Sequence, residues 1–174
     1  MENSRFLFGD DNMRCFEKIS FEQFKKDVSD DIELYESYNL PVRSTKGSAG
    51  YDFEALFDFV LKPGEIKKIP TGIKANMNDG EVLFLIVRSS QGFKYNVRMC
   101  NQVGVIDKDY YNNSDNEGHI WLKLENHGDK DYEVKKGDKI IQGIFINILT
   151  IDNEEEIEKE RTSGIGSTDK KESA

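Results

Sequence analysis

The chain has 174 residues, of which 33% are charged and 37% hydrophobic, and its formal net charge is −9. These values fit one rather polar domain with a core of its own. The acidic balance argues against broad binding to nucleic acid or to an acidic membrane, because a polyanion would be repelled. A small polyanion could still bind where local arginines, lysines or a metal ion make the electrostatic potential positive.

The first predicted elements are a short strand and a helical segment. Residues 13–20 alternate in polarity, which predicts the strand. Ser20 followed by Gln23 is typical of a capping box, so a helix is expected to begin there and to extend over about residues 20–38. The two aspartates at 30–31 are expected to split it into two short helices. Its apolar stripe consists of Phe21, Phe24, Val28, Ile32 and Tyr35.

From residue 41 the pattern changes to short strands separated by turn sequences such as those at 62–64 and 78–80. Strands at this spacing predict an all-β barrel or sandwich. We therefore expect an N-terminal extension at 1–12, a β domain at 13–151, and an acidic tether with a C-terminal arm at 152–174. The expected strands cover residues 66–77 (broken by Pro70 and Gly72), 81–87, 119–125 and 139–149.

The C-terminal segment combines an acidic run at 152–160 with the glycine- and hydroxyl-rich sequence RTSGIGST at 161–168. Extended, the run could carry the second sequence about 30 Å, far enough to reach another subunit. Its glycines would allow a close backbone approach to a ligand, and its arginine and hydroxyls suit phosphate oxygens. The plain alternative is a disordered polar tail. The sequence RTSGIGST lacks the glycine spacing and the Gly-Lys-Ser/Thr ending of a P-loop.

Three other places put polar groups beside apolar strands. The sequence VRSS at 87–90 ends the most apolar strand, Gln142 lies inside an apolar strand, and Asp52 follows small residues. The sequence GVIDKDYYN at 104–112 brings two acids and two tyrosines together. Each of these four features also has a purely structural interpretation. The sequence VRSS would be a strand-to-loop turn and Gln142 a hydrogen-bonded core amide, whereas Asp52 would cap a turn and GVIDKDYYN would be a solvated charged turn.

The cysteines and histidines form no ligand or nucleophile pattern. Cys15 and Cys100 are expected to be reduced thiols, as in a cytoplasmic protein. His119 and His127 have no third partner at metal spacing, and nothing places a serine beside either one. No signal peptide is expected at the start, and the longest apolar run, six residues at 82–87, is far short of the roughly 20 that span a bilayer.

Taken in order, the segments SAGYD, RSS, GVIDKDY, GDKIIQ and RTSGIGST resemble the five motifs of the trimeric dUTP pyrophosphatase (dUTPase) family, over roughly residues 41 to 169. The resemblance implies a dUTPase-like β-barrel or jelly roll of the β-clip type, with a small N-terminal helical insertion and a flexible C-terminal arm. It also implies hydrolysis of dUTP to dUMP and pyrophosphate with Mg²⁺, in a homotrimer with active sites at subunit interfaces.

The resemblance further implies residue roles. Asp107 would act as general base on the water that attacks the α-phosphorus, Tyr110 would lie under the deoxyribose and exclude a 2′-hydroxyl, and Asn101 would help to bind the uracil edge. Asp52 would support the metal through water only, with no direct protein ligand. Arg88, Ser89 and Gln142 would bind the α- and β-phosphates, and Arg161, Ser167 and Thr168 would belong to the arm that closes over the γ-phosphate. The remaining substrate-binding positions are Ser90, Gly104, Val105, Ile106, Ile165 and Gly166.

Several positions depart from the family pattern. Ile165 stands where an aromatic residue usually covers the uracil, Ser163 replaces a usual glycine and Lys139 a usual arginine. The segment after Tyr110 is longer than usual, and the helical segment at 20–38 is additional, either as a structural cap or as a contact for a partner.

Two other functions stay open at this stage. The dCTP deaminases resemble dUTPases in fold, but Phe93 and Lys123 stand where they need an arginine and the proton-shuttling glutamate. The other is a dUTPase scaffold with a second role in binding a protein regulator, served by the acidic surface and the extra helix.

Overall fold

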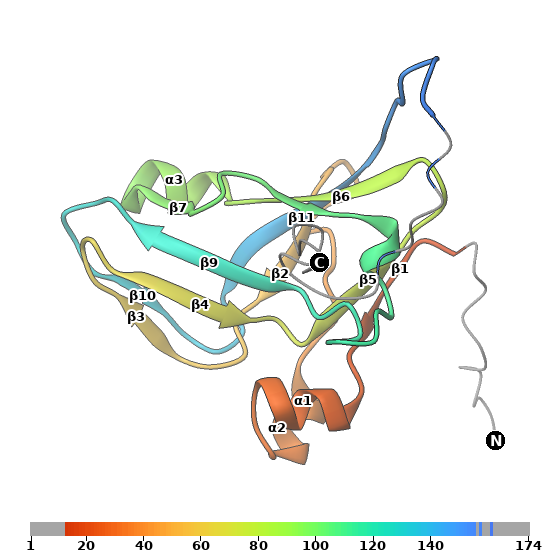
Figure 1. The fold of residues 1–174 in the computed structure, drawn as a ribbon. Coiled ribbons are helices and arrows are strands. Elements are labelled where there is room, and N and C mark those ends of the chain that lie inside the picture. Colours follow the sequence, from red (N-terminus) through yellow and green to blue (C-terminus); the bar gives the residue numbers. More distant parts are fainter. Residues whose placement is uncertain (1–12, 156, 158–160, 162–174) are drawn as a thin grey trace, which may run out of the picture.

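The computed structural model describes residues 13–155, 157 and 161, and it is mostly β (Figure 1). Its strands form a small jelly-roll-like β fold from four sheets, and within the described residues they do not close into a barrel. The predicted jelly roll is thus confirmed, whereas a closed barrel is not formed. The elements are β1 (Cys15–Lys18), α1 (Phe21–Asp27), α2 (Ile32–Ser37), β2 (Tyr51–Glu54), β3 (Phe59–Leu61), β4 (Ile66–Pro70), β5 (Ile73–Asn76), β6 (Glu81–Ile86), α3 (Ser89–Tyr95), β7 (Val97–Met99), β8 (Gly104–Ile106), the 3₁₀ turn η1 (Lys108–Tyr110), β9 (Trp121–Asn126), β10 (Tyr132–Val134) and β11 (Lys139–Asn147).

The N-terminal segment attaches to the β fold through β1, which pairs antiparallel with β5. The Ser20 hydroxyl accepts the backbone N–H of Gln23 at 3.1 Å, as the capping pattern predicts, and α1 and α2 lie beside each other outside the sheets (Figure 1). Asp31 caps α2, so the predicted split is confirmed. Phe24 is fully buried, but Ile32 is 47% exposed because the second helix turns this part of the predicted stripe outward.

The largest sheet, with the strand order β2-β11-β6-β8, aligns positions on three strands that are far apart in sequence. Gln142 of β11 lies opposite Asp52 of β2 on one side and opposite Ile86 of β6 on the other. A bulge between Lys139 and Ile141 shifts the pairing at the start of β11. The register therefore brings Asp52, Gln142 and the end of β6 to one place.

The other sheets enclose the core. In β9, between β4 and β7, Leu122 and Leu124 are fully buried while Lys123 points to solvent, which is the predicted alternation. Burial of each such leucine contributes about 1.5–3 kcal/mol. The predicted break at Pro70 is also found, since β4 ends there and β5 begins at Ile73.

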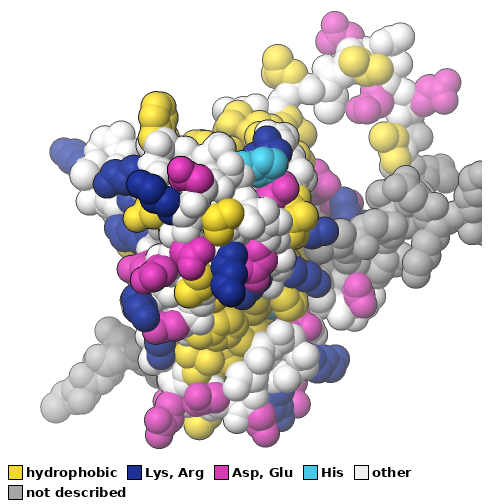
Figure 2. Space-filling model, turned by 90° about the vertical axis from the view of Figure 1, so that its left-hand side faces the viewer, with side chains coloured by type: hydrophobic (Ala, Val, Ile, Leu, Met, Phe, Trp, Pro, Cys, Tyr) yellow, Lys and Arg dark blue, Asp and Glu magenta, His cyan; other side chains and the backbone are white. Residues whose placement is uncertain are grey.

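The surface carries charges of both signs. On the face shown in Figure 2, Lys and Arg side chains are interspersed with Asp and Glu and do not gather into a basic patch. No helix among the described residues is both long and apolar enough to cross a bilayer.

Candidate active site

The first candidate half of the site is a cavity of about 260 Å³, here called the base-side cavity. It lies where η1 and the turn between β7 and β8, two strands that belong to different sheets, approach β9. The predicted Asn101, Asp107 and Tyr110 all line it, with Asn101 and Asp107 exposed and Tyr110 buried. The full lining is Leu85, Met99, Asn101, Gly104, Val105, Ile106, Asp107, Tyr110, Trp121 and Arg161.

The glycine ahead of Asp107 is needed for close packing. A Cβ on Gly104 would lie 3.1 Å from Cβ of Leu85 on the paired strand and 3.2 Å from the methyl of Met99. The absence of a side chain lets β8 lie close to β6 and to Met99 at the end of β7. Asp107 then leaves the sheet directly after Ile106, with an extended backbone (φ −77°, ψ 157°) that starts η1.

Tyr110 forms a fixed wall of the base-side cavity. The residue is 6% exposed, its hydroxyl donates to the carbonyl of His119 at 2.9 Å, and it accepts from Nδ2 of Asn116 at 2.9 Å. Burial raises the pKa of Tyr110, so the phenol is neutral at physiological pH. A rigid apolar ring at this place suits contact with a flat or alicyclic ligand.

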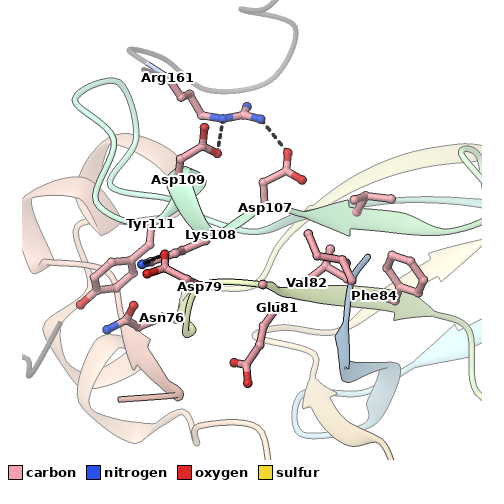
Figure 3. Close-up of a pocket in the computed structure, with 13 residues that line it drawn as sticks. Asn76, Asp79, Glu81, Val82, Phe84, Asp107, Lys108, Asp109, Tyr111 and Arg161 are labelled. Carbon is pink, nitrogen blue, oxygen red and sulfur yellow. Dashed lines mark hydrogen bonds and ion pairs between the residues drawn. The ribbon is translucent and has the colours of Figure 1, made fainter. Parts of the chain in front are cut away.

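Asp107 and Asp109 converge on one guanidinium. Nη2 of Arg161 lies 2.7 Å from Oδ2 of Asp107, and Nε of Arg161 lies 2.9 Å from Oδ1 of Asp109 (Figure 3). The arginine side chain is 15% exposed, whereas the two carboxylates are about half exposed. The predicted arm residue Arg161 thus contacts the predicted base of its own chain.

A wider groove of about 1040 Å³ adjoins this carboxylate pair. It shares Val105, Asp107 and Arg161 with the base-side cavity and extends along the start of β6, past Glu81 and Phe84 (Figure 3). Among the described residues its carboxylates form no metal cluster, and Glu81 is engaged by Arg14 through Nε at 2.9 Å.

The second candidate half is a cavity of about 340 Å³, here called the phosphate-side cavity. Asp52 lies at its base and is 6% exposed. Oδ1 of Asp52 accepts from Nε of Arg88 at 2.9 Å, and Oδ2 lies 3.1 Å from Nζ of Lys139 and 2.5 Å from the Ser44 hydroxyl. The lining is Ser44, Ser48, Gly50, Asp52, Arg88, Ser89, Ser90 and Gln142.

The charge balance of this cavity favours an anionic ligand. Burial by itself would raise the pKa of Asp52, but the Ser44 hydroxyl, Lys139 and Arg88 together hold it below its usual value. Two cations therefore share one carboxylate, which leaves a net positive charge. Ser89 and Ser90 are exposed at its rim and can donate to ligand oxygens.

Gln142 is held by close packing in the same cavity. Its Nε2 donates to the carbonyl of Val87 at 3.4 Å, and a Cβ on Gly50 would lie 2.4 Å from its Oε1. The glycine of the segment SAGYD therefore makes room for the glutamine side chain. This contact explains why those two segments meet, although they lie about 90 residues apart in sequence.

Asp107 and Arg88 lie toward opposite ends of β6, although the base-side cavity itself extends along this strand to Leu85. Asp107 follows Ile106, which pairs with Leu83 near the start of β6, whereas Arg88 lies beyond its end. Six residues of strand separate the positions of Val82 and Arg88, which is roughly 20 Å. Groups that act on one phosphorus atom must approach it to about 3–3.5 Å, so Asp107 and Arg88 of one chain are too far apart to contact the same phosphate.

The residues described hold no group of three or more His, Cys, Asp or Glu side chains suited to direct metal ligation. Oδ2 of Asp52 is engaged by both Lys139 and Ser44, whereas Oδ1 contacts Arg88 and keeps a second lone pair that can accept from a metal-bound water. Mg²⁺ retains several waters and favours nucleotide phosphates as ligands. The donor set thus fits Mg²⁺ carried by a triphosphate.

The structure divides the predicted residues between the two cavities and places them at their rims and walls. Ile165, Gly166, Ser167 and Thr168 lie outside the described residues. Sequence reasoning did not identify Ser44, Lys139 or Asp109 as charge partners, or His119 behind Tyr110. Lys139 and Asp109 lie within the segments GDKIIQ and GVIDKDY, which was the only local signal for them.

Comparison with known proteins identifies the class. The dUTPase family model matches residues 36–169, and the chain belongs to the dUTPase family. A curated deoxyuridine 5′-triphosphate nucleotidohydrolase of Lactococcus lactis subsp. lactis is 52% identical over 131 residues, covering 75% of this chain and 87% of the relative. The enzyme of the same name from Haemophilus influenzae strain PittEE is 34% identical over 122 residues, covering 68% of this chain and 77% of the relative.

Solved structures agree with this assignment. The dUTPase from Streptococcus mutans is 39% identical and superposes with a TM-score of 0.63, covering 79% of this chain and 98% of that one. The dUTPase of Staphylococcus aureus phage phi11, described as coordinating a structural Mg(II) ion, is 21% identical with a TM-score of 0.61, covering 85% and 98%. At that identity the phage enzyme supports the fold alone.

Proposed function

We propose that this chain is a dUTP diphosphatase, which hydrolyses dUTP to dUMP and pyrophosphate and so keeps uracil out of DNA and supplies dUMP for thymidylate synthesis. Family membership supports the reaction. The observation that carries the proposal for this chain is the position of Asp107, a half-exposed carboxylate at the edge of a cavity walled by buried Tyr110.

The proposed mechanism follows from these positions. Asp107 takes a proton from the water that attacks the α-phosphorus, a contribution of about 10²- to 10⁴-fold for a well-placed base. Tyr110 lies under the deoxyribose and leaves no room for a 2′-hydroxyl, while Asn101 binds the uracil edge from the exposed turn between β7 and β8. Mg²⁺, when bound with the triphosphate, neutralises charge on its oxygens.

The phosphate-side cavity would bind the α- and β-phosphates through Arg88, Ser89, Ser90 and Gln142, with Asp52 oriented toward the metal's water shell. Its cationic balance supports this role. The roles of Gly104, Val105 and Ile106 beside the base stay predictions, as do those of the arm residues 165–168 over the γ-phosphate. Arg161 would move from its carboxylate partners to the γ-phosphate when the arm closes.

We propose a homotrimer in which neighbouring chains complete each site. The roughly 20 Å between the strand positions of Asp107 and Arg88 in one chain supports this arrangement, since Arg88 of a neighbouring chain must then approach each Asp107. Both cysteines are free thiols, which supports a cytoplasmic enzyme.

A substrate panel tests the proposed function. The full chain is incubated with Mg²⁺ and dUTP, UTP, dCTP or dTTP, and pyrophosphate release is measured. We expect efficient release from dUTP alone. Ammonia release from dCTP without dUTP hydrolysis would instead support a deaminase, and comparable turnover of UTP would remove the role given to Tyr110.

A further inference from the structure

Two additions to the usual family pattern contact each other behind the base-side cavity: helix α1 and the segment 111–118. We propose that Asp27 of α1 is a positioning residue, which acts through His119 to fix the ring of Tyr110 and thereby sets the preference for deoxyribonucleotides over ribonucleotides. This inference rests on the proposed function, because it concerns the same substrate cavity.

The geometry fixes the tautomer of His119. The ring is fully buried, and its Nε2 lies 2.9 Å from the backbone nitrogen of Gly72, which can only donate. Nε2 is therefore the acceptor, and Nδ1 carries the proton that it donates to Oδ2 of Asp27 at 2.6 Å. Burial lowers the pKa of His119 despite its carboxylate partner, which agrees with a neutral ring.

His119 connects directly to Tyr110. The tyrosine hydroxyl donates to the backbone carbonyl of His119, and the amide of Asn116 donates to the same hydroxyl, both at 2.9 Å. The phenol therefore has one fixed donor and one fixed acceptor, and the ring cannot slide along its long axis without losing one of them. On its other side, the imidazole packs 4.8 Å from the ring of Trp121, which also lines the base-side cavity.

Asp27 is itself held in place from within α1. Nε2 of Gln23 donates to Oδ2 of Asp27 at 2.9 Å, so two donors converge on the same carboxylate oxygen. The start of the helix is attached to the inserted segment, because Glu117 accepts the backbone N–H of Ser20 at 2.8 Å and its hydroxyl at 2.5 Å. The helix thus contacts this part of the structure at two points, one turn or more apart.

The consequence concerns selectivity. Without Asp27 the buried Nδ1–H of His119 has no acceptor, and either ring rotation or a tautomer change would remove its bond to Gly72 as well. The backbone carbonyl that holds the Tyr110 hydroxyl belongs to the same residue. A displacement of the tyrosine ring would open space where a 2′-hydroxyl is otherwise excluded. The kcat/KM for UTP would then rise relative to that for dUTP.

The test compares Asp27→Ala, Asp27→Asn and, as a matched control, Glu22→Ala. Glu22 lies on the same helix, but its side chain is 79% exposed and pairs only with Lys25. We expect Asp27→Ala to narrow the dUTP-to-UTP ratio of kcat/KM by about ten-fold or more. An asparagine oxygen at the position of Oδ2 can accept both donors, so Asp27→Asn should restore the ratio, and Glu22→Ala should leave it unchanged.

A second readout does not depend on turnover. The chain has one tryptophan, and its position in the cavity lets Trp121 fluorescence report binding of dUMP and UMP. We expect the Asp27→Ala variant to bind the two with closer affinities. An unchanged ratio in Asp27→Ala, with or without a lower melting temperature, overturns the proposal.

If Asp27→Ala does not fold, the Asp27→Glu variant serves as the test, because its extra methylene displaces the carboxylate from His119. An unchanged dUTP-to-UTP ratio of kcat/KM in that variant also overturns the proposal. Failure of the wild-type chain to hydrolyse dUTP would reject the proposed function instead, and is seen before any variant is compared.

Discussion

Replacing Asp107 by asparagine separates the catalytic role of its charge from any role in stability, because Asp109 provides a matched control. The two carboxylates are 50% and 57% exposed and lie 2.7 and 2.9 Å from the same guanidinium. An exposed ion pair contributes about 0.2–1 kcal/mol, so each substitution should cost the fold no more than about 1 kcal/mol. Loss of a general base costs about 10²- to 10⁴-fold in rate, or about 2.7–5.4 kcal/mol of activation free energy.

The assay measures pyrophosphate release at saturating dUTP and Mg²⁺ for both variants, alongside their melting temperatures. We expect Asp107→Asn to lose at least about a hundred-fold in kcat, and Asp109→Asn to stay within a few-fold of the wild type. Both should melt within a few degrees of the wild type. Equal loss of rate in the two variants would refute the reasoning, because it would assign the effect to the shared arginine contact.

Three further predictions address assembly, packing and acid stability. Mixing unfolded Asp107→Asn and Arg88→Ala chains and refolding them together should restore about a quarter of wild-type activity if neighbouring chains complete each site, and none if one chain supplies both residues. Gly118 has φ +82°, and a Cβ there would lie 2.6 Å from a backbone carbonyl, whereas Gly80 at φ +74° has open space. Gly118→Ala should therefore cost about 1–3 kcal/mol more than Gly80→Ala in denaturant unfolding. A hydrogen bond from Arg14 lowers the pKa of Glu81 from 4.5 to about 2. Between these two pH values the unfolded chain binds more protons than the folded chain, so the free energy of unfolding falls as the pH drops through this range. Glu81→Gln should flatten the dependence of melting temperature on pH between about 4.5 and 2, and an unchanged slope would contradict this.

Local patterns were sufficient for the elements whose cause is local. The cap at Ser20, the break at Pro70 and the alternation in β9 each depend on residues within a few positions of one another, and each appears in the structure. The grouping of Asp52, Arg88 and Gln142 depends on the register of the largest sheet, and the order of motifs implied it where periodicity could not.

Contacts between distant segments could not be predicted in this way. His119 offered no metal or nucleophile spacing, and its partner Asp27 lies 92 residues away on a helix that the family pattern does not contain. Ile32 followed the helical period of the stripe, but the turn between α1 and α2 rotated it to the surface. In both cases the deciding interaction is tertiary, and a sequence window holds only one of the two partners.

The span of β6 also has a consequence for enzyme output in the cell. Under the proposed assembly, a lone subunit contains no complete reaction centre. Catalytic output would then rise more steeply than protein abundance near the association threshold. Dilution below that threshold would silence the enzyme.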